Sequence, residues 1–168
     1  MEGLGLRRAE KKDISQMTEI LNQSIRWGKA TAFLEELRPV DRLSWLENHS
    51  TDPYVIFVAE ERQEILGYLS LGPYRAGREA FRHVAEVSYF VHFDHHRKGI
   101  ASSLMDHALN HCRKNGIEVL LAFLYASNAA SIHFLEKYGF GEWGFYPGLI
   151  KKGKELSDHV VYGVNLTS

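Results

Sequence analysis

Four basic or imidazole side chains stand directly before two small residues in the middle of the chain. Residues 95–98 are His, His, Arg and Lys, and Gly99 and Ala101 follow at the start of a pattern with a helical period. The first turn of a helix has N–H groups without intrahelical partners and the positive end of the dipole, which favour a phosphate or diphosphate. An ordinary strand-to-helix turn with solvated basic residues explains the stretch equally well.

Two common phosphate-binding motifs are absent from the sequence. No G-x-x-x-x-G-K-[ST] occurs, and no G-x-G-x-x-G follows an expected strand. The chain is also balanced in charge, with 20 Lys and Arg against 21 Asp and Glu. Such a balance argues against the broad positive field that nucleic acid or an anionic membrane requires, so we expect neither as a partner. Any anion site must therefore be local.

Histidines are the other residues that could do chemistry. His92, His95 and His96 are close in sequence, and His107 and His111 are four residues apart on an expected helix. No Cys cluster accompanies them, and the segment HALNH lacks the Glu of a metalloprotease helix. We therefore expect no bound metal.

The single cysteine and the absence of long apolar runs indicate the compartment. Cys112 has no intrachain partner for a disulfide, which favours a reducing compartment, and we expect it to be a buried small hydrophobe. The longest apolar run, VLLAFLYA, is far shorter than the roughly 20 residues that span a bilayer. The sequence therefore predicts a soluble, cytoplasmic protein.

Residues 1–168 are expected to form one α/β domain, because no repeat, linker or low-complexity tract divides them. The order of elements predicts a mixed sheet with helices on its faces. Asp13 and Gln16 indicate a capping box at the first helix, which is expected to end near Gly28. Strands are expected at 4–9, 54–61, 64–74, 81–93, 118–125, around 140–147 and 158–166, and helices at 14–28, 43–46, 99–115 and 128–139.

Two segments in this order resemble the GNAT N-acetyltransferase superfamily. The family patterns are [QR]-x-x-G-x-[GA] and, farther along, N-x-x-[AS]-x-x-x-[Y]-x-x-x-G-F. His96, Gly99 and Ala101 occupy the first pattern, and Asn128, Ser131, Gly139 and Phe140 occupy the second. Further segments, GKATAF, GYLSLGPYR and FRHVAEVSYFVH among them, look like the phosphinothricin and methionine-sulfoximine acetyltransferase branch. This similarity covers most of residues 5–166.

The resemblance implies the GNAT fold, a mixed and splayed sheet with helices on both faces, and acetyl-CoA as the acetyl donor. It also implies a homodimer. The pantetheine arm would lie along the strand at Tyr89–Val91, and the diphosphate would rest on the amides of Arg97–Ser102. The implied cofactor-binding residues are Tyr89, Phe90, Val91, His96, Arg97, Lys98, Gly99, Ile100, Ala101, Ser102 and Asn128.

An amine accepts an acetyl group only when it is neutral, so acetylation near pH 7 needs a base or a proton-conducting water chain. Glu86 is the candidate base, because the similar branch has its acidic residue in the corresponding strand. Ser88 lies two positions farther along the strand and therefore on the same face. The alternative is that Glu86 forms a cross-strand ion pair at the surface.

The chain departs from the family at two positions. Superfamily members often have Tyr, and the similar branch often has His, where this chain has Leu135. The departing thiolate must then take its proton from water or another group, or leave unprotonated. His96 replaces the usual Gln or Arg, which is tolerable where backbone amides hold the diphosphate.

The resemblance implies direct transfer, in a ternary complex, to the primary amine of a small amino-acid-like substrate such as phosphinothricin or methionine sulfoximine. Phe33 falls where the similar branch lines its acceptor pocket, and an arginine of the segment around Tyr74, Arg75 and Arg78 could bind a substrate carboxylate. Together with Glu86 and Ser88 these are the expected substrate-binding residues. A solvated basic loop, a noncatalytic acyl-CoA-binding module and a peptide or protein N-acetyltransferase remain alternatives.

Overall fold

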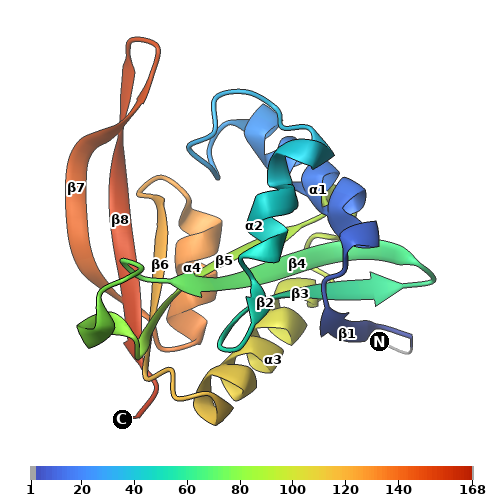
Figure 1. Ribbon diagram of the computed structural model, residues 1–168. Coiled ribbons are helices and arrows are strands. Elements are labelled where there is room, and N and C mark those ends of the chain that lie inside the picture. Colours follow the sequence, from blue (N-terminus) through green and yellow to red (C-terminus); the bar gives the residue numbers. More distant parts are fainter. Residues whose placement is uncertain (1–2, 168) are drawn as a thin grey trace.

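The computed structural model describes residues 3–167, which form one eight-stranded mixed sheet with helices on both faces (Figure 1). Four short 3-10 turns at 11–13, 39–42, 79–81 and 93–95 connect the longer elements. The elements are β1 (Gly5–Arg8), α1 (Ile14–Trp27), α2 (Leu43–Glu47), β2 (Ser50–Thr51), β3 (Tyr54–Glu61), β4 (Glu64–Pro73), β5 (Val84–Val91), α3 (Ile100–Lys114), β6 (Val119–Tyr125), α4 (Ala129–Lys137), β7 (Gly141–Lys152) and β8 (Glu155–Asn165).

The strands lie in the order β1-β3-β4-β5-β6-β8-β7, and β2 adds to β3 outside this path. The β5–β6 pair is parallel and the other pairs are antiparallel. This confirms the predicted mixed sheet and the order of its elements. Strand β2 was not predicted, and β7 and β8 are longer than expected, forming the hairpin seen at the left of Figure 1.

Successive residues of β3 belong to different hydrophobic cores, as the alternation of a strand requires. Val55 and Phe57 pack with α3 and α4 residues on one face. Ile56 and Val58 pack with α1 on the other. Cys112 is fully buried in the α3 core, which confirms its predicted role as a small hydrophobe.

Helix α1 ends where the sequence predicts, but it does not begin with the predicted capping box. Gly28 terminates the helix with a φ of +82°. Asp13 makes no side-chain bond to the helix and instead accepts from both terminal nitrogens of Arg7, at 2.7 and 2.9 Å, and from the Glu10 amide. Gln16 accepts from the Ile65 amide at the start of β4. Both side chains are therefore used in tertiary contacts.

The central strands separate partway along their length. The β5–β6 ladder pairs residues 84–86 with 119–121 and ends there, although both strands continue. On its other edge β5 pairs with β4 from Ala85 to Val91. The edge of β5 from Val87 to Val91 that faces β6 is thus left without a strand partner, and the gap opens beside the start of α3.

No described helix of the chain is both long and apolar enough to cross a membrane.

Candidate active site

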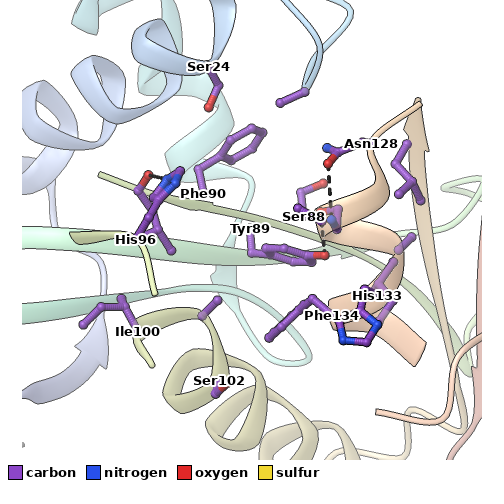
Figure 2. Close-up of a pocket in the computed structure, with 18 of the residues that line it drawn as sticks. Ser24, Ser88, Tyr89, Phe90, His96, Ile100, Ser102, Asn128, His133 and Phe134 are labelled. Carbon is purple, nitrogen blue, oxygen red and sulfur yellow. Dashed lines mark hydrogen bonds between the residues drawn. The ribbon is translucent and has the colours of Figure 1, made fainter. Parts of the chain in front are cut away.

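A hollow of about 690 Å³ occupies the gap between β5 and β6. Its walls come from the last five residues of β5, the turn that leads into α3, the first turn of α3, the middle of β6, α4 and the end of α1. Figure 2 shows the Tyr89 ring lying in the middle of this hollow, with Phe134 on the α4 side and Ile100 on the α3 side. The sheet therefore provides a cleft that runs from the start of α3 to the start of α4.

The first turn of α3 presents free backbone donors to one end of the hollow. The first intrahelical bond is from the Ser103 amide to the Gly99 carbonyl, at 3.0 Å, so the amides of residues 100–102 precede it. Gly99 has a φ of +76°, a conformation that an L side chain adopts only at a cost. Arg97 also lines the hollow. This end fits a diphosphate group, with backbone donors, a positive helix end and an arginine.

Two of the predicted diphosphate-binding side chains are placed differently from the rest. The His96 Nε2 lies 3.0 Å from the Val91 carbonyl, so this nitrogen bonds the end of β5 while the ring still borders the hollow. Lys98 does not line the hollow, unlike its neighbours Arg97 and Gly99. In this loop the side chain of His96 shapes the turn, and the amides of the helix are the main donors.

The unpaired edge of β5 forms the long wall of the hollow. Tyr89, Phe90 and Val91, the residues expected along the pantetheine arm, all line it. An extended ligand with amide groups could pair with this edge in the way that an added strand does. The gap therefore fits an arm containing peptide-like amides that begins at the α3 end.

Asn128 closes the opposite end. It is the N-cap of α4, where its side-chain oxygen accepts from the Ser131 amide at 3.2 Å. The Ser131 hydroxyl in turn lies 2.9 Å from the Tyr89 hydroxyl, and dashed lines in Figure 2 mark both contacts. Burial raises the pKa of Tyr89 to about 12, although the bond with Ser131 acts in the opposite direction. Asn128 thus borders the hollow, and the cap does not use its amide nitrogen.

Glu86 lies at the point where β5 and β6 separate, as the last residue of β5 that pairs with β6. Burial raises the pKa of its carboxyl group. Within residues 3–167 the carboxylate has no hydrogen-bond or ion-pair partner, so the predicted alternative of a cross-strand ion pair is wrong. Its side chain does not line the hollow, but Ser88, on the same face, does. Chemically, a half-buried carboxylate without a partner can accept a proton.

The predicted substrate-binding residues do not all meet in one place. Tyr74, Arg75 and Arg78 line a second hollow of about 450 Å³ beyond the end of β4. The Tyr74 ring stacks on Phe123, with ring centroids 6.4 Å apart, and Phe123 lines the first hollow. Phe33 lines neither hollow. The arginines are therefore separated from the cleft by an aromatic pair.

The end of α1 contributes wall residues that the sequence did not predict. Trp27 and Ala30 line the first hollow. Trp27 is 49% exposed and Phe33 is 48% exposed, so neither side chain belongs to the core. Both residues follow the point near Ile25 where the apolar pattern stops, at a helix end and in a loop. These positions were the signal in the sequence that the two side chains are exposed.

Lys152 and Tyr125 hold the segment after α1 against the sheet. The Lys152 ammonium donates to the carbonyls of Gly28 and Thr31, at 2.9 and 3.2 Å. The Tyr125 hydroxyl donates to Thr31 as well, at 3.3 Å. These bonds place the segment that follows Trp27 over the β6 side of the sheet.

The histidines belong to no group of three or more potential metal ligands within the described part of the chain. His111 instead contacts the Pro53 carbonyl at 3.1 Å, and both His107 and His111 pack edge-on against Phe57. These two rings serve packing between α3 and β3.

Comparison with known proteins gives a consistent result. The sequence model described as "Acetyltransferase (GNAT) family" matches residues 15–140. The L-methionine sulfoximine/L-methionine sulfone acetyltransferase of Salmonella typhimurium is 34% identical over 138 residues, 80% of this chain and 78% of that protein. The phosphinothricin N-acetyltransferase of Streptomyces coelicolor is 30% identical over 144 residues, 84% of each. The structure of yncA from Salmonella typhimurium with acetyl-CoA has a TM-score of 0.89 at 28% identity, covering 98% and 95% of the two chains.

Proposed function

The chain belongs to the GNAT acetyltransferase family and is an acetyl-CoA-dependent N-acetyltransferase, and we propose that its acceptor is the primary amine of a small amino-acid-like molecule. Phosphinothricin and methionine sulfoximine are the first candidates. One relative, 30% identical, is named a phosphinothricin N-acetyltransferase, and another, 34% identical, is named an L-methionine sulfoximine/L-methionine sulfone acetyltransferase. The observation that carries the proposal is the unpartnered Glu86 carboxylate at the point where the two central strands separate.

The residues on the walls of the cleft fit acetyl-CoA, which supplies an activated acetyl thioester when bound. The amides of residues 100–102 and the Arg97 side chain would hold the diphosphate. The free edge of β5 from Val87 to Val91 would bond the amides of the arm. Asn128 would contribute its amide nitrogen from the other side of the gap.

Glu86 is proposed to take the proton that the acceptor amine must lose. Burial raises the pKa of the carboxyl group, which makes its ionised form a stronger base than an exposed glutamate. Ser88 lies on the same face of β5 and would help to orient the amine or a water between the two groups. The amine attacks the acetyl carbon directly, with both substrates bound.

The second hollow is proposed to bind the carboxylate of the acceptor. Arg75 and Arg78 are both exposed there, and within the described residues neither has a carboxylate partner. An arginine fork matches a carboxylate in a bidentate geometry. Rotation of the Tyr74 ring away from Phe123 would join the two hollows, so an amino acid could span them with its amine near Glu86.

The test is acetyl-CoA turnover with a panel of amines, followed by release of the free thiol. Phosphinothricin, methionine sulfoximine and methionine sulfone should be acetylated, while their carboxamides and a peptide of the same N-terminal residue should react at least tenfold more slowly. Equal rates for the free acids and the carboxamides would show that Arg75 and Arg78 do not bind the carboxylate of the acceptor. Preference for the peptide would instead support a peptide N-acetyltransferase.

A further inference from the structure

The departing sulfur of a thioester needs a hydrogen-bond donor in the middle of the cleft. When the C–S bond breaks, its electron pair stays on sulfur, and a charge in a water-poor site is costly unless a donor faces it. Leu135, which lines the hollow from α4, has no donor. The donor must therefore come from another residue of the wall.

Tyr89 and Ser131 together leave one O–H group free for this purpose. The two hydroxyls have two hydrogens, and the 2.9 Å contact between them uses one. The Asn128 side chain occupies the Ser131 amide, not its hydroxyl. One hydroxyl hydrogen of the pair thus remains without a partner among the described residues, and both side chains line the hollow.

The other hydroxyls of the wall are less suitably placed. Ser102 is in the first turn of α3, at the end that fits the diphosphate. Ser88 faces the Glu86 side of β5, whereas Tyr89 faces the α3 and α4 side. Ser24 is buried on α1. Tyr89 is the one that lies between the two helix starts in Figure 2.

We propose that the Tyr89–Ser131 hydroxyl pair donates a hydrogen bond to the sulfur of coenzyme A and stabilises the departing thiolate. This inference rests on the proposed function for its place in the reaction. The N–C bond forms as the C–S bond breaks, the amine proton leaves through Glu86, and the electron pair stays on sulfur. Tyr89 remains protonated throughout, so it acts as a donor and not as an acid.

A raised pKa agrees with this role. A phenol with a pKa of about 12 is still protonated in the pH range around 8.5, where a thiol of ordinary pKa ionises. It therefore offers its hydrogen without transferring it. The competing explanation is that the hydroxyl pair only stabilises the packing of α4 against β5. In that case, removing it changes the free energy of unfolding but not the pKa of the bound thiol.

The first experiment measures the pKa of the thiol in bound, unacetylated CoA from the ultraviolet absorbance of the thiolate. Taken as the difference between the chain with and without CoA, the thiolate signal belongs to CoA, because burial raises the pKa of Cys112, the chain's single cysteine, to about 12. The intact chain should lower the pKa of the bound thiol below that of free CoA. Tyr89→Phe should raise it by about one unit, as expected for loss of one hydrogen bond to a charged group.

Tyr138→Phe is the matched control, since its hydroxyl bonds the Ser102 carbonyl and does not line the hollow. It should leave the pKa of the bound thiol unchanged. If Tyr89→Phe fails to fold, Ser131→Ala takes its place, and it should raise the pKa of the bound thiol by a smaller amount. An unchanged pKa in whichever variant is measured overturns the inference.

A kinetic readout separates this inference from the proposed function. Tyr89→Phe should lower kcat with acetyl-CoA about tenfold, with little change in KM for acetyl-CoA. With the selenoester analogue, whose selenol is a better leaving group, the loss of kcat should be much smaller. Equal losses with both donors overturn the role at sulfur, while turnover by the intact chain upholds the transferase. If the intact chain lowers the pKa of bound CoA but acetylates no amine of the panel, the proposed acceptor class fails instead.

Discussion

Glu86 is a half-buried carboxylate with no counter-charge among the described residues. Asp13, also buried, accepts from Arg7 twice and from a backbone amide, and its pKa is lowered in spite of burial. At Glu86 burial acts alone, so the pKa rises. Ionising a carboxylate at this position is unfavourable. We therefore infer that Glu86 serves proton transfer and not the stability of the fold.

Replacing this carboxylate tests that purpose. Glu86→Gln keeps the size of the side chain and removes the base, so kcat should fall by about 10²- to 10⁴-fold. The dissociation constant of CoA should stay within about threefold, since Glu86 does not line the cleft. Both are measured by thiol release and calorimetric titration. Parallel losses of turnover and CoA affinity would assign Glu86 a structural role.

The pH profile provides a second check on Glu86. Its pKa is raised, so the ionised base is lost as pH falls through a value above the ordinary glutamate pKa of about 4.3. We expect the acid limb of kcat/KM to have a midpoint above that value and to be absent from the residual activity of Glu86→Gln. A limb that persists in the variant belongs to another group, such as the amine itself.

The role of a single residue could be predicted where the backbone conformation determines it. It could not be predicted where a side chain has several possible partners. Gly99 and Asn128 are at the cleft because a left-handed turn and a helix cap fix their places. His96 carries a side chain that reaches either the ligand or the Val91 carbonyl, and only the structure shows which. Phe33 lies in a loop whose path depends on Lys152, more than a hundred residues away.

At the scale of elements, α3 does the most for the site, because its first turn supplies the amides at one end of the cleft. Gly99→Asp would place a carboxylate and a Cβ at the diphosphate seat, and affinity for CoA should fall at least 100-fold. Gly116→Asp is the matched control, since it puts the same residue at another positive φ, +73°, with open space around it beyond the other end of α3. Titration calorimetry on both variants measures the difference. Equal CoA affinity in the two would place the diphosphate elsewhere.

Helix α4 combines capping with a proposed contact at the cleft, and two substitutions of Asn128 separate these roles. Asn128→Ala removes the cap and should lower the free energy of unfolding by about 1 kcal/mol as well as CoA affinity. Asn128→Asp keeps an oxygen for the Ser131 amide and should preserve stability while still weakening CoA binding. Denaturant titration and calorimetry check both. Full CoA affinity in Asn128→Asp would show that the amide nitrogen makes no contact.

Most elements could be predicted because periodicity and turn residues agree. The turn between β3 and β4 is in the expected place, although Arg62 and Gln63 form it with φ values of +51° and +68°, without glycine or asparagine. The alternating apolar strands on either side hold the turn in that conformation. Likewise the Asp13 to Gln16 spacing has the pattern of a capping box, but Arg7 and the β4 backbone provide stronger partners.

For the whole molecule, the Arg7–Asp13 pair joins β1 to α1, and Glu60 of β3 also bonds Arg7. The pKa of Asp13 is lowered in the folded chain, so its contribution is complete above about pH 4 and is lost as pH falls toward the lowered value. Asp13→Asn should lower the free energy of unfolding by about 1–3 kcal/mol at pH 7. The difference should shrink at pH 3, and denaturant midpoints at both pH values measure it. A constant difference would mean that the charge is not responsible.

The gap between β5 and β6 is the feature that sequence patterns could least determine. VLLAFLY predicts a strand covered on both faces but does not say where its pairing with β5 stops. Beyond that point Phe123 packs against Tyr74 on one face of the sheet, and β6 residues pack with α4 on the other. The resemblance to a family implied a splayed sheet, and the register locates the separation after Glu86.

The most direct test is a crystal structure of the chain with acetyl-CoA. Diphosphate oxygens should lie within about 3.2 Å of the amides of residues 100–102, and the arm should lie alongside Val87 to Val91. A diphosphate bound at any other surface, with that helix start free, would contradict the placement and with it the assigned residues of the cleft.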